Sequence, residues 1–214
     1  MPSAGTRSFD GQSEATPSQR PVPMMHRLAA VTKTIKTCSF EDNNMRYDNI
    51  SMIGDADKVR FLLYKKGERV LFVIGVNPST ANERIPDNTI RRVMGFADRE
   101  GFDGFAMINV YPQRCANPNH LHPVCDQYLH KQNLDTIVNT IGHHQNPTIL
   151  VAFGNLISKR KYLKDCFLDI VTALRPYKPN WKQIGALTKS GNPRHPLMAK
   201  YQPICDFDIA DFMK

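Results

Sequence analysis

Three apolar runs in the chain alternate with segments in which apolar residues recur at helical spacing. Each run has the length and composition of a strand buried on both faces. The runs cover residues 70–76, 105–110 and 148–153. Helical spacing of apolar positions is found in residues 88–100, 126–142 and 155–174. This alternation predicts an α/β domain with a mainly parallel sheet.

Further elements flank this alternating region. Residues 59–64 form a strand candidate, and a Gly-containing turn at 65–68 leads from it into the first apolar run, which predicts a β-hairpin. Residues 181–187 are a fourth strand candidate, and residues 206–213 are typical of a short terminal helix. The sequence therefore predicts a central sheet of four mainly parallel strands with an N-terminal β-hairpin extension.

The amino-terminal segment differs in composition from the rest of the chain. Residues 1–27 are rich in Ser, Pro and Gly and carry few apolar residues, so we expect a disordered tail or leader there. Residues 28–214 are expected to form a single domain. No apolar run reaches the roughly 20 residues that a membrane-spanning helix needs, so no membrane partner is expected. The oligomeric state stays open.

The net charge and the cysteine content limit the kinds of partner and the cellular compartment that we expect for the protein. A formal net charge of +8 fits either a solvated basic surface or a polyanionic partner such as nucleic acid. The five cysteines are odd in number and have no CxxC spacing, which favours reduced thiols and a cytoplasmic location. No histidine pair has a third ligand at a convincing spacing. We therefore expect neither a metal nor another cofactor.

The segments that follow the predicted strands should meet at one edge of the sheet, because crossovers between parallel strands are right-handed. After the first apolar run, Asn77 precedes Pro78, and Ser79 and Thr80 follow. Such an Asn-Pro pair is usually a turn whose side chain caps its own backbone, and the two hydroxyl residues fit a helix cap. At the end of a buried strand they are also candidates for a ligand-binding crevice.

Two further polar residues come from other segments of that edge. Asn109 ends the second apolar run, where its carboxamide needs a hydrogen-bond partner, either nearby backbone or the edge of a nucleobase. Pro196 restricts His195 to an extended backbone. A fixed imidazole can donate to an oxygen that gains charge in a transition state, whereas a lone loop histidine is more often a surface residue.

Charged residues on the same edge fit either structural roles or phosphate binding. Asp87 precedes the helix predicted at 88–100, where it fits a helix cap, an ion-pair partner or an acid–base group. Arginines on this edge can grip phosphate oxygens with paired N–H donors. The candidates are Arg91, Arg92, Arg114 and Arg194.

Five short motifs carry a resemblance to a known family. They are N-P-S-T-A at 77–81, D-x-T-x-R-R at 87–92, N-x-Y-x-x-R at 109–114, V-A-F-G at 151–154 and G-x-P-R-H-P-L at 191–197. Together they resemble a bacterial and phage family of poorly characterised proteins that is built on the NPSTA signature. The resemblance extends over residues 46–198.

The order of these motifs is also similar to that of the uracil-DNA glycosylase superfamily. The resemblance implies a three-layer α/β/α fold of the uracil-DNA glycosylase type. It implies that Asn77 positions a water molecule and that His195 supports the leaving base, so both are catalytic candidates. It also implies a group of residues that bind the base, namely Asn109, Ser79 and Thr80.

The chain departs from the superfamily pattern at three points. Ser79 stands where glycine usually follows the Asn-Pro pair, and Leu197 stands where serine usually follows the His-Pro pair. No aromatic residue directly follows the Asn-Pro turn to stack on a base. These differences indicate a pocket for an unusual base.

The residues and the resemblance together predict a DNA glycosylase. It would cleave the N-glycosidic bond of a flipped-out, modified or damaged pyrimidine base and leave an abasic site, in repair or in defence against modified foreign DNA. Two alternatives stay open. A non-catalytic module that binds nucleic acid or nucleotides is favoured by the absence of a titrating group at position 77. A hydrolase of free nucleosides or nucleotides needs no DNA partner.

Overall fold

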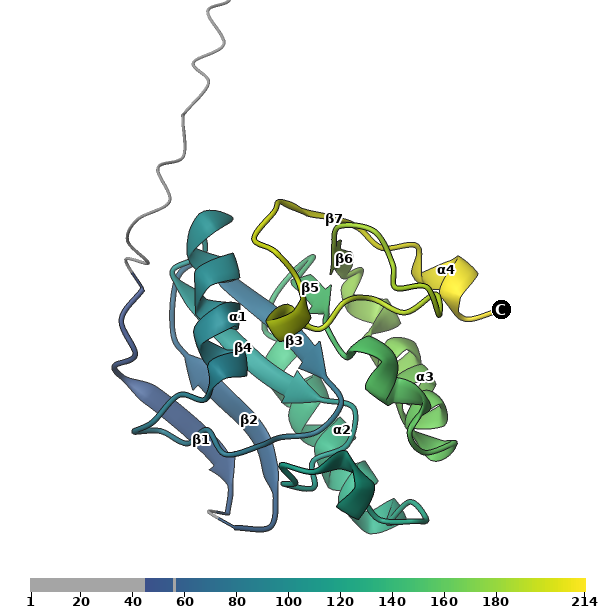
Figure 1. Cartoon of the computed structure of the whole chain (residues 1–214). Coiled ribbons are helices and arrows are strands. Elements are labelled where there is room, and N and C mark those ends of the chain that lie inside the picture. Colours follow the sequence, from purple (N-terminus) through teal and green to yellow (C-terminus); the bar gives the residue numbers. More distant parts are fainter. Residues whose placement is uncertain (1–44, 56) are drawn as a thin grey trace, which may run out of the picture. The chain divides into compact units, whose positions relative to one another are not determined.

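The computed structural model describes residues 45–55 and 57–214, in which the strands form one sheet (Figure 1). In spatial order they are β1 (Ile50–Gly54), β2 (Arg60–Lys65), β4 (Gly104–Asn109), β3 (Val70–Gly75), β5 (Thr148–Val151), β6 (Asn180–Ile184) and β7 (Ile204–Asp206). The central strands β4, β3, β5 and β6 run parallel. The tail expected at residues 1–27 lies outside the described residues.

The prediction of a mainly parallel, four-stranded sheet is wrong, although the fold is α/β. Within the described residues the sheet has seven strands, and three of its six pairings are antiparallel: β1 with β2, β2 with β4, and β6 with β7. The strands missed by the sequence are at the edges. β1 is largely exposed and β7 has three residues, so neither has the long apolar run that marks a strand buried on both faces.

The predicted hairpin between the first two strand candidates is also wrong. β4 lies between β2 and β3, and β2 pairs antiparallel with β4 and with β1 instead. The connection from β2 to β3 passes around the start of β4, where the Asp103 carboxylate accepts from the N–H groups of Glu68 (3.0 Å) and Arg69 (2.7 Å). A Cβ at Gly104 would lie 2.6 Å from a backbone oxygen of β2, so this close passage requires glycine.

Helices cover both faces of the sheet (Figure 1). α1 (Asn88–Arg99) packs its apolar side on one face, and α2 (Gln127–Ile141) and α3 (Tyr162–Leu174) pack on the other. These three helices confirm the helical segments predicted from apolar spacing. The shorter helical segments are η1 (Pro118–His120), η2 (Gly154–Ser158), η3 (Arg175–Tyr177), η4 (Pro196–Met198) and α4 (Ile209–Phe212). None of the helices in the described residues is long and apolar enough to cross a membrane.

The parallel strands bring the predicted site segments to one edge of the sheet. Gly75 at the end of β3 is in register with Asn109 at the end of β4. Beyond the strands, the N–H of Val110 donates to the carbonyl of Gly75 (2.9 Å), and the N–H of Tyr111 donates to the carbonyl of Val76 (2.9 Å). The turn after β3 is therefore held against the loop after β4.

Candidate functional site

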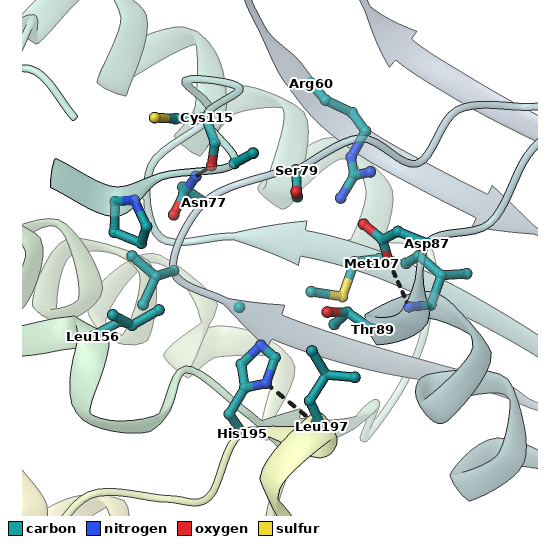
Figure 2. Close-up of a pocket in the computed structure, with 15 residues that line it drawn as sticks. Arg60, Asn77, Ser79, Asp87, Thr89, Met107, Cys115, Leu156, His195 and Leu197 are labelled. Carbon is teal, nitrogen blue, oxygen red and sulfur yellow. Dashed lines mark hydrogen bonds between the residues drawn. The ribbon is translucent and has the colours of Figure 1, made fainter. Parts of the chain in front are cut away.

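A pocket of about 180 Å³ lies at the carboxyl ends of β3 and β4 (Figure 2). We call it the strand-end pocket. Its polar lining residues are Arg60, Asn77, Ser79, Asp87, Thr89, Cys115 and His195. An apolar cavity of about 150 Å³ holds one benzene ring, so the strand-end pocket suits a single small ring rather than a whole nucleotide.

Asn77 is fixed in the turn after β3 with its amide oxygen free to accept. Its Nδ2 donates to the carbonyl oxygens of Pro78 (2.9 Å) and Cys115 (2.7 Å). Because both partners are acceptors, the amide group can have only one orientation. No hydrogen bond to Asn77 Oδ1 is present among the described residues. Figure 2 shows the nitrogen directed at Cys115 and the oxygen turned away from it, so the side chain offers an acceptor to an occupant of the pocket.

His195 reaches the pocket from the segment before η4. Its Nδ1 accepts from the N–H of Leu197 (3.3 Å), which leaves Nε2 to carry the proton of the neutral ring. Figure 2 shows this second nitrogen on the pocket side of the ring. Burial lowers the pKa of His195 below its ordinary value of 6.5, with a smaller opposing effect from Asp87. The ring is therefore a neutral hydrogen-bond donor near pH 7.

The backbone around His195 is held by close packing and by hydrogen bonds. Gly154 has φ +61°, and a Cβ on it would lie 3.0 Å from Cβ of His195, so glycine is needed there. Two residues of the loop before His195 donate hydrogen bonds to Asn155 Oδ1, namely Thr188 from Oγ1 (2.8 Å) and Asn192 from Nδ2 (3.1 Å). The loop is thus tied to the segment after β5.

Asp87 caps helix α1 and also faces the pocket. Its Oδ1 accepts from the N–H of Ile90 (2.9 Å), and its Oδ2 lies 3.4 Å from the N–H of Ala81. The cap predicted from the sequence is therefore present. Thr89 and Ile90 in the first turn of α1 complete this side of the pocket.

Sequence reasoning missed three of the polar pocket residues, Arg60, Thr89 and Cys115, of which Arg60 alone is charged. Arg60 begins β2, is 2% exposed and lines the pocket. Its Nη1 donates to the carbonyl of Ala81 (3.0 Å), while Nε has no partner among the described residues. A charged residue at the start of an apolar strand candidate was the available signal, because an arginine is rarely buried there without a role.

Asn109, expected to read a base edge, does not line the pocket. Its side chain is fully buried, and neither amide atom has a hydrogen-bond partner in the part of the chain that the structure describes. A Cβ on Gly75 would lie 2.9 Å from Asn109 Oδ1, and Gly75 itself lines the pocket. Asn109 is therefore a buried amide directly beside the pocket wall.

The other predicted base-binding residues divide between pocket and surface. Ser79 lines the pocket and is half-buried. Thr80 is exposed and is not a lining residue. The structure thus brings together Asn77, Ser79, Asp87 and His195.

Three of the four candidate phosphate-binding arginines donate to backbone carbonyls. Arg92 donates to Pro196 (3.2 Å) and to Ala199. Arg114 donates to the carbonyl of Ala81 (3.1 Å), and Arg194 donates to backbone carbonyls in the loop before it. These three side chains hold the loops around the pocket.

The fourth arginine differs from the other three. Arg91 lies in the first turn of α1 and its side chain is exposed to solvent. It is therefore the candidate that is best placed to meet a phosphate outside the protein.

A family model described as "Protein of unknown function (DUF1643)" matches residues 60–197, well over half of the chain. The chain belongs to this family. The DUF1643 segment begins at Arg60 and ends at Leu197, so it contains every residue that lines the strand-end pocket. It leaves out the edge strands β1 and β7 and the terminal helix α4. Neither the curated proteins nor the solved structures contain a match to the chain.

The chemistry available to this DUF1643 protein is that of positioned hydrogen bonds. Asn77 offers a fixed acceptor, and His195 offers a fixed neutral donor in the same pocket. Within the described residues no group of three or more His, Cys, Asp or Glu is placed to hold a metal ion. The arrangement suits the orientation of a water molecule and the stabilisation of a developing negative charge.

Proposed function

We propose that the protein is a DNA glycosylase that hydrolyses the N-glycosidic bond of a modified or damaged pyrimidine base flipped out of DNA. The observation that carries the proposal is the pairing of Asn77 and His195 across a pocket that suits one ring. Both side chains are oriented by backbone groups, so that an acceptor and a donor face the same occupant. The resemblance of the motif order to that of the uracil-DNA glycosylase superfamily supports the same reaction.

In the proposed reaction the C1′–N bond breaks and its electron pair stays on the base, which leaves as an anion from an oxocarbenium-like sugar. Asn77 Oδ1 accepts a hydrogen bond from the water whose oxygen then adds to C1′. The cation-like sugar needs only a weak nucleophile, so a group that orients the water is sufficient. His195 Nε2–H donates to a carbonyl oxygen of the departing base. The proton released by the water finally neutralises the base.

The surroundings of the pocket support a polymeric substrate. The chain has a formal net charge of +8, which favours a polyanion. Leu197, which lines the strand-end pocket, is 46% exposed, and the next residue, Met198, is 82% exposed. Exposed apolar side chains of this kind can fill the space that a flipped base leaves in the stack. Cytoplasmic location belongs to the proposal and is supported by free cysteine thiols in the described residues.

The test uses oligonucleotides that carry uracil, mispaired bases or modified cytosines, and it measures strand cleavage at abasic sites after alkali treatment. The wild-type protein should produce abasic sites from at least one of them. Asn77→Ala and His195→Ala should each reduce the rate by about 10²-fold or more, as loss of an oriented catalytic group does. Exposed residues away from the pocket supply matched controls, Asn139→Ala and His143→Ala, which should keep the wild-type rate. Absence of abasic product from the whole panel would refute the proposal.

A second candidate is hydrolysis of free nucleosides or nucleotides. It is favoured by the engagement of Arg92, Arg114 and Arg194 with backbone carbonyls, which leaves fewer cations for a DNA backbone. The same panel offered as nucleosides separates the two reactions, because release of free base from nucleosides but not from DNA would favour the second. DNA binding that weakens with salt and shows no turnover would instead identify a binding module.

A further inference from the structure

Arg60 is a buried cation in the wall of the strand-end pocket. It is 2% exposed, and the one hydrogen bond that its guanidinium makes within the described residues goes to the carbonyl of Ala81. A guanidinium has five N–H donors, and Nε of Arg60 is among the buried atoms that lack a partner. Figure 2 shows the guanidinium directed into the pocket. The side chain therefore brings positive charge to the wall of the pocket.

The charge of Arg60 is only partly balanced. Burial lowers its pKa to about 10, which leaves the guanidinium protonated at neutral pH, and Asp87 acts in the opposite direction. No ion pair joins Arg60 to a carboxylate in the described part of the chain, since Asp87 directs its oxygens to the N–H groups of Ile90 and Ala81. A buried charge without a paired counter-ion is costly. Functional sites are where buried charges of this kind cluster.

Arg60 and Asn77 lie on different sides of the pocket. Figure 2 shows the guanidinium of Arg60 on the side of Asp87, and Asn77 beside Cys115 and away from Asp87. If Asn77 is at the sugar, as the proposed function requires, then Arg60 meets the ring at a distance from the bond that breaks. The electron pair from that bond is delocalised over the ring nitrogens and carbonyl oxygens of the base, so charge develops at that side of the ring as well.

We propose that Arg60 is a further catalytic residue, whose guanidinium stabilises the negative charge that the leaving base acquires as the C1′–N bond breaks. This inference rests on the proposed function. The base is neutral in the ground state and anionic at departure, so a fixed cation binds the second form more strongly and lowers the barrier. His195 contributes a neutral donor, whereas Arg60 contributes a full charge in a site sheltered from water.

The first experiment varies the leaving group. Wild type and Arg60→Met are compared in single-turnover reactions on oligonucleotides with 5-fluorouracil, uracil or thymine, whose ring N–H acidity falls in that order. The poorer the leaving group, the more charge stabilisation it needs. Loss of Arg60 should therefore slow thymine release most, by about 10²-fold or more, and 5-fluorouracil release least. Arg60→Lys, which keeps the charge, should restore part of this difference.

Arg114→Met is the matched control. Arg114 donates to the same carbonyl of Ala81 as Arg60 does, but it does not line the pocket. Its loss should change the rate by the same factor for all three bases. If Arg60→Met also changes all three rates by one factor, the role of Arg60 is structural and the inference is overturned. Circular dichroism of each variant confirms that folded protein is compared.

The second experiment measures binding without turnover. The free base 5-nitrouracil is ionised at neutral pH and serves as the anion probe, and calorimetry gives its affinity. Arg60→Met should weaken binding by about 10-fold or more, while Asp87→Asn, which keeps a capping side chain, should strengthen it. Equal affinities of wild type and Arg60→Met would overturn the inference. Absence of abasic product from wild type would refute the proposed function instead, so the two failures are distinguishable.

Discussion

Adjacent arginines on α1 have opposite environments, which gives a sharp test of how the site is built. Arg92 donates from Nε to the carbonyl of Pro196 (3.2 Å) and from Nη2 to that of Ala199, and its guanidinium stacks 3.6 Å from the centre of the Tyr201 ring. Arg91 is exposed. We therefore expect Arg92→Ala to destabilise the fold and Arg91→Ala to leave it unchanged.

The magnitude follows from the contacts. One hydrogen bond contributes about 1 kcal/mol net to the free energy of unfolding, and Arg92 makes two. A cation–π contact adds about 1 kcal/mol, so Arg92→Ala should lower the free energy of unfolding by about 3 kcal/mol. For a protein of this length, that corresponds to a fall in Tm of about 6–12 °C. Arg91→Ala should change the free energy by less than about 0.5 kcal/mol. Thermal unfolding followed by circular dichroism measures both.

DNA binding should show the opposite ranking. If Arg91 meets a phosphate, Arg91→Ala reduces the slope of log K against log salt by about 1, since each phosphate contact in duplex DNA contributes about 0.9. Arg92→Ala should keep the wild-type slope at temperatures well below its Tm. Arg92→Lys should recover only part of the lost stability, because an ammonium lacks the planar stacking surface. An unchanged Tm together with a reduced slope for Arg92→Ala would refute the reasoning.

Three further predictions concern the same region. Because burial lowers the pKa of His195, the unfolded chain binds its proton more readily, so stability should fall as pH drops below about 6.5. Abasic-site formation should fall only at lower pH, where the imidazole of the folded protein gains its second proton, and a rate that rises on acidification would contradict the neutral-donor role. Gly95→Ala should lower the free energy of unfolding by about 2 kcal/mol, because the added Cβ would lie 2.2 Å from the Tyr201 hydroxyl. Urea titration measures this change, and a loss below about 0.5 kcal/mol would show that the Tyr201 ring moves aside freely. Gly154→Ala would place a side chain on a residue with φ +61° and put its Cβ 3.0 Å from Cβ of His195. We expect the free energy of unfolding to fall by about 1–2 kcal/mol and the glycosylase rate to fall about 10-fold. Wild-type kinetics for this variant would show that the loop adjusts to the added methyl group.

The central elements were predictable because burial on both faces leaves a strong sequence pattern. β3 and β4 are apolar runs that end at Gly75 and Asn109, β5 is a third apolar run, and α1 presents its apolar residues at helical spacing. Edge strands carry no such pattern, because one side of each pairs with nothing and the side chains are half-exposed. The order of strands was mispredicted for a different reason. A short turn permits a hairpin, but only the long-range packing shows that β4 lies between β2 and β3.

In the candidate site, too, the local sequence predicts some features, whereas others depend on long-range packing. A cap at Asp87 and an extended backbone at His195 are local properties, and both are found in the structure. The groups that an arginine side chain contacts are not determined by the neighbouring sequence. Arg92 donates to carbonyls more than 100 positions away in the chain, and Arg60 reaches the pocket from the opposite end of the DUF1643 segment to His195.

The hydrogen bonds that the arginines make within the protein bear on how a DNA substrate would be recognised. Arg92, Arg114 and Arg194 give donors to backbone carbonyls, and Arg60 is buried, so these four side chains offer few free donors to the phosphates of a DNA backbone. A protein that bound DNA mainly by counterion release would keep such groups exposed. Arg60 instead places one positive charge in the pocket wall, where it acts on a bound ring from a buried position. Discrimination should therefore arise at the flipped base, with a shallow salt dependence of binding and a large effect of pocket substitutions on the rate.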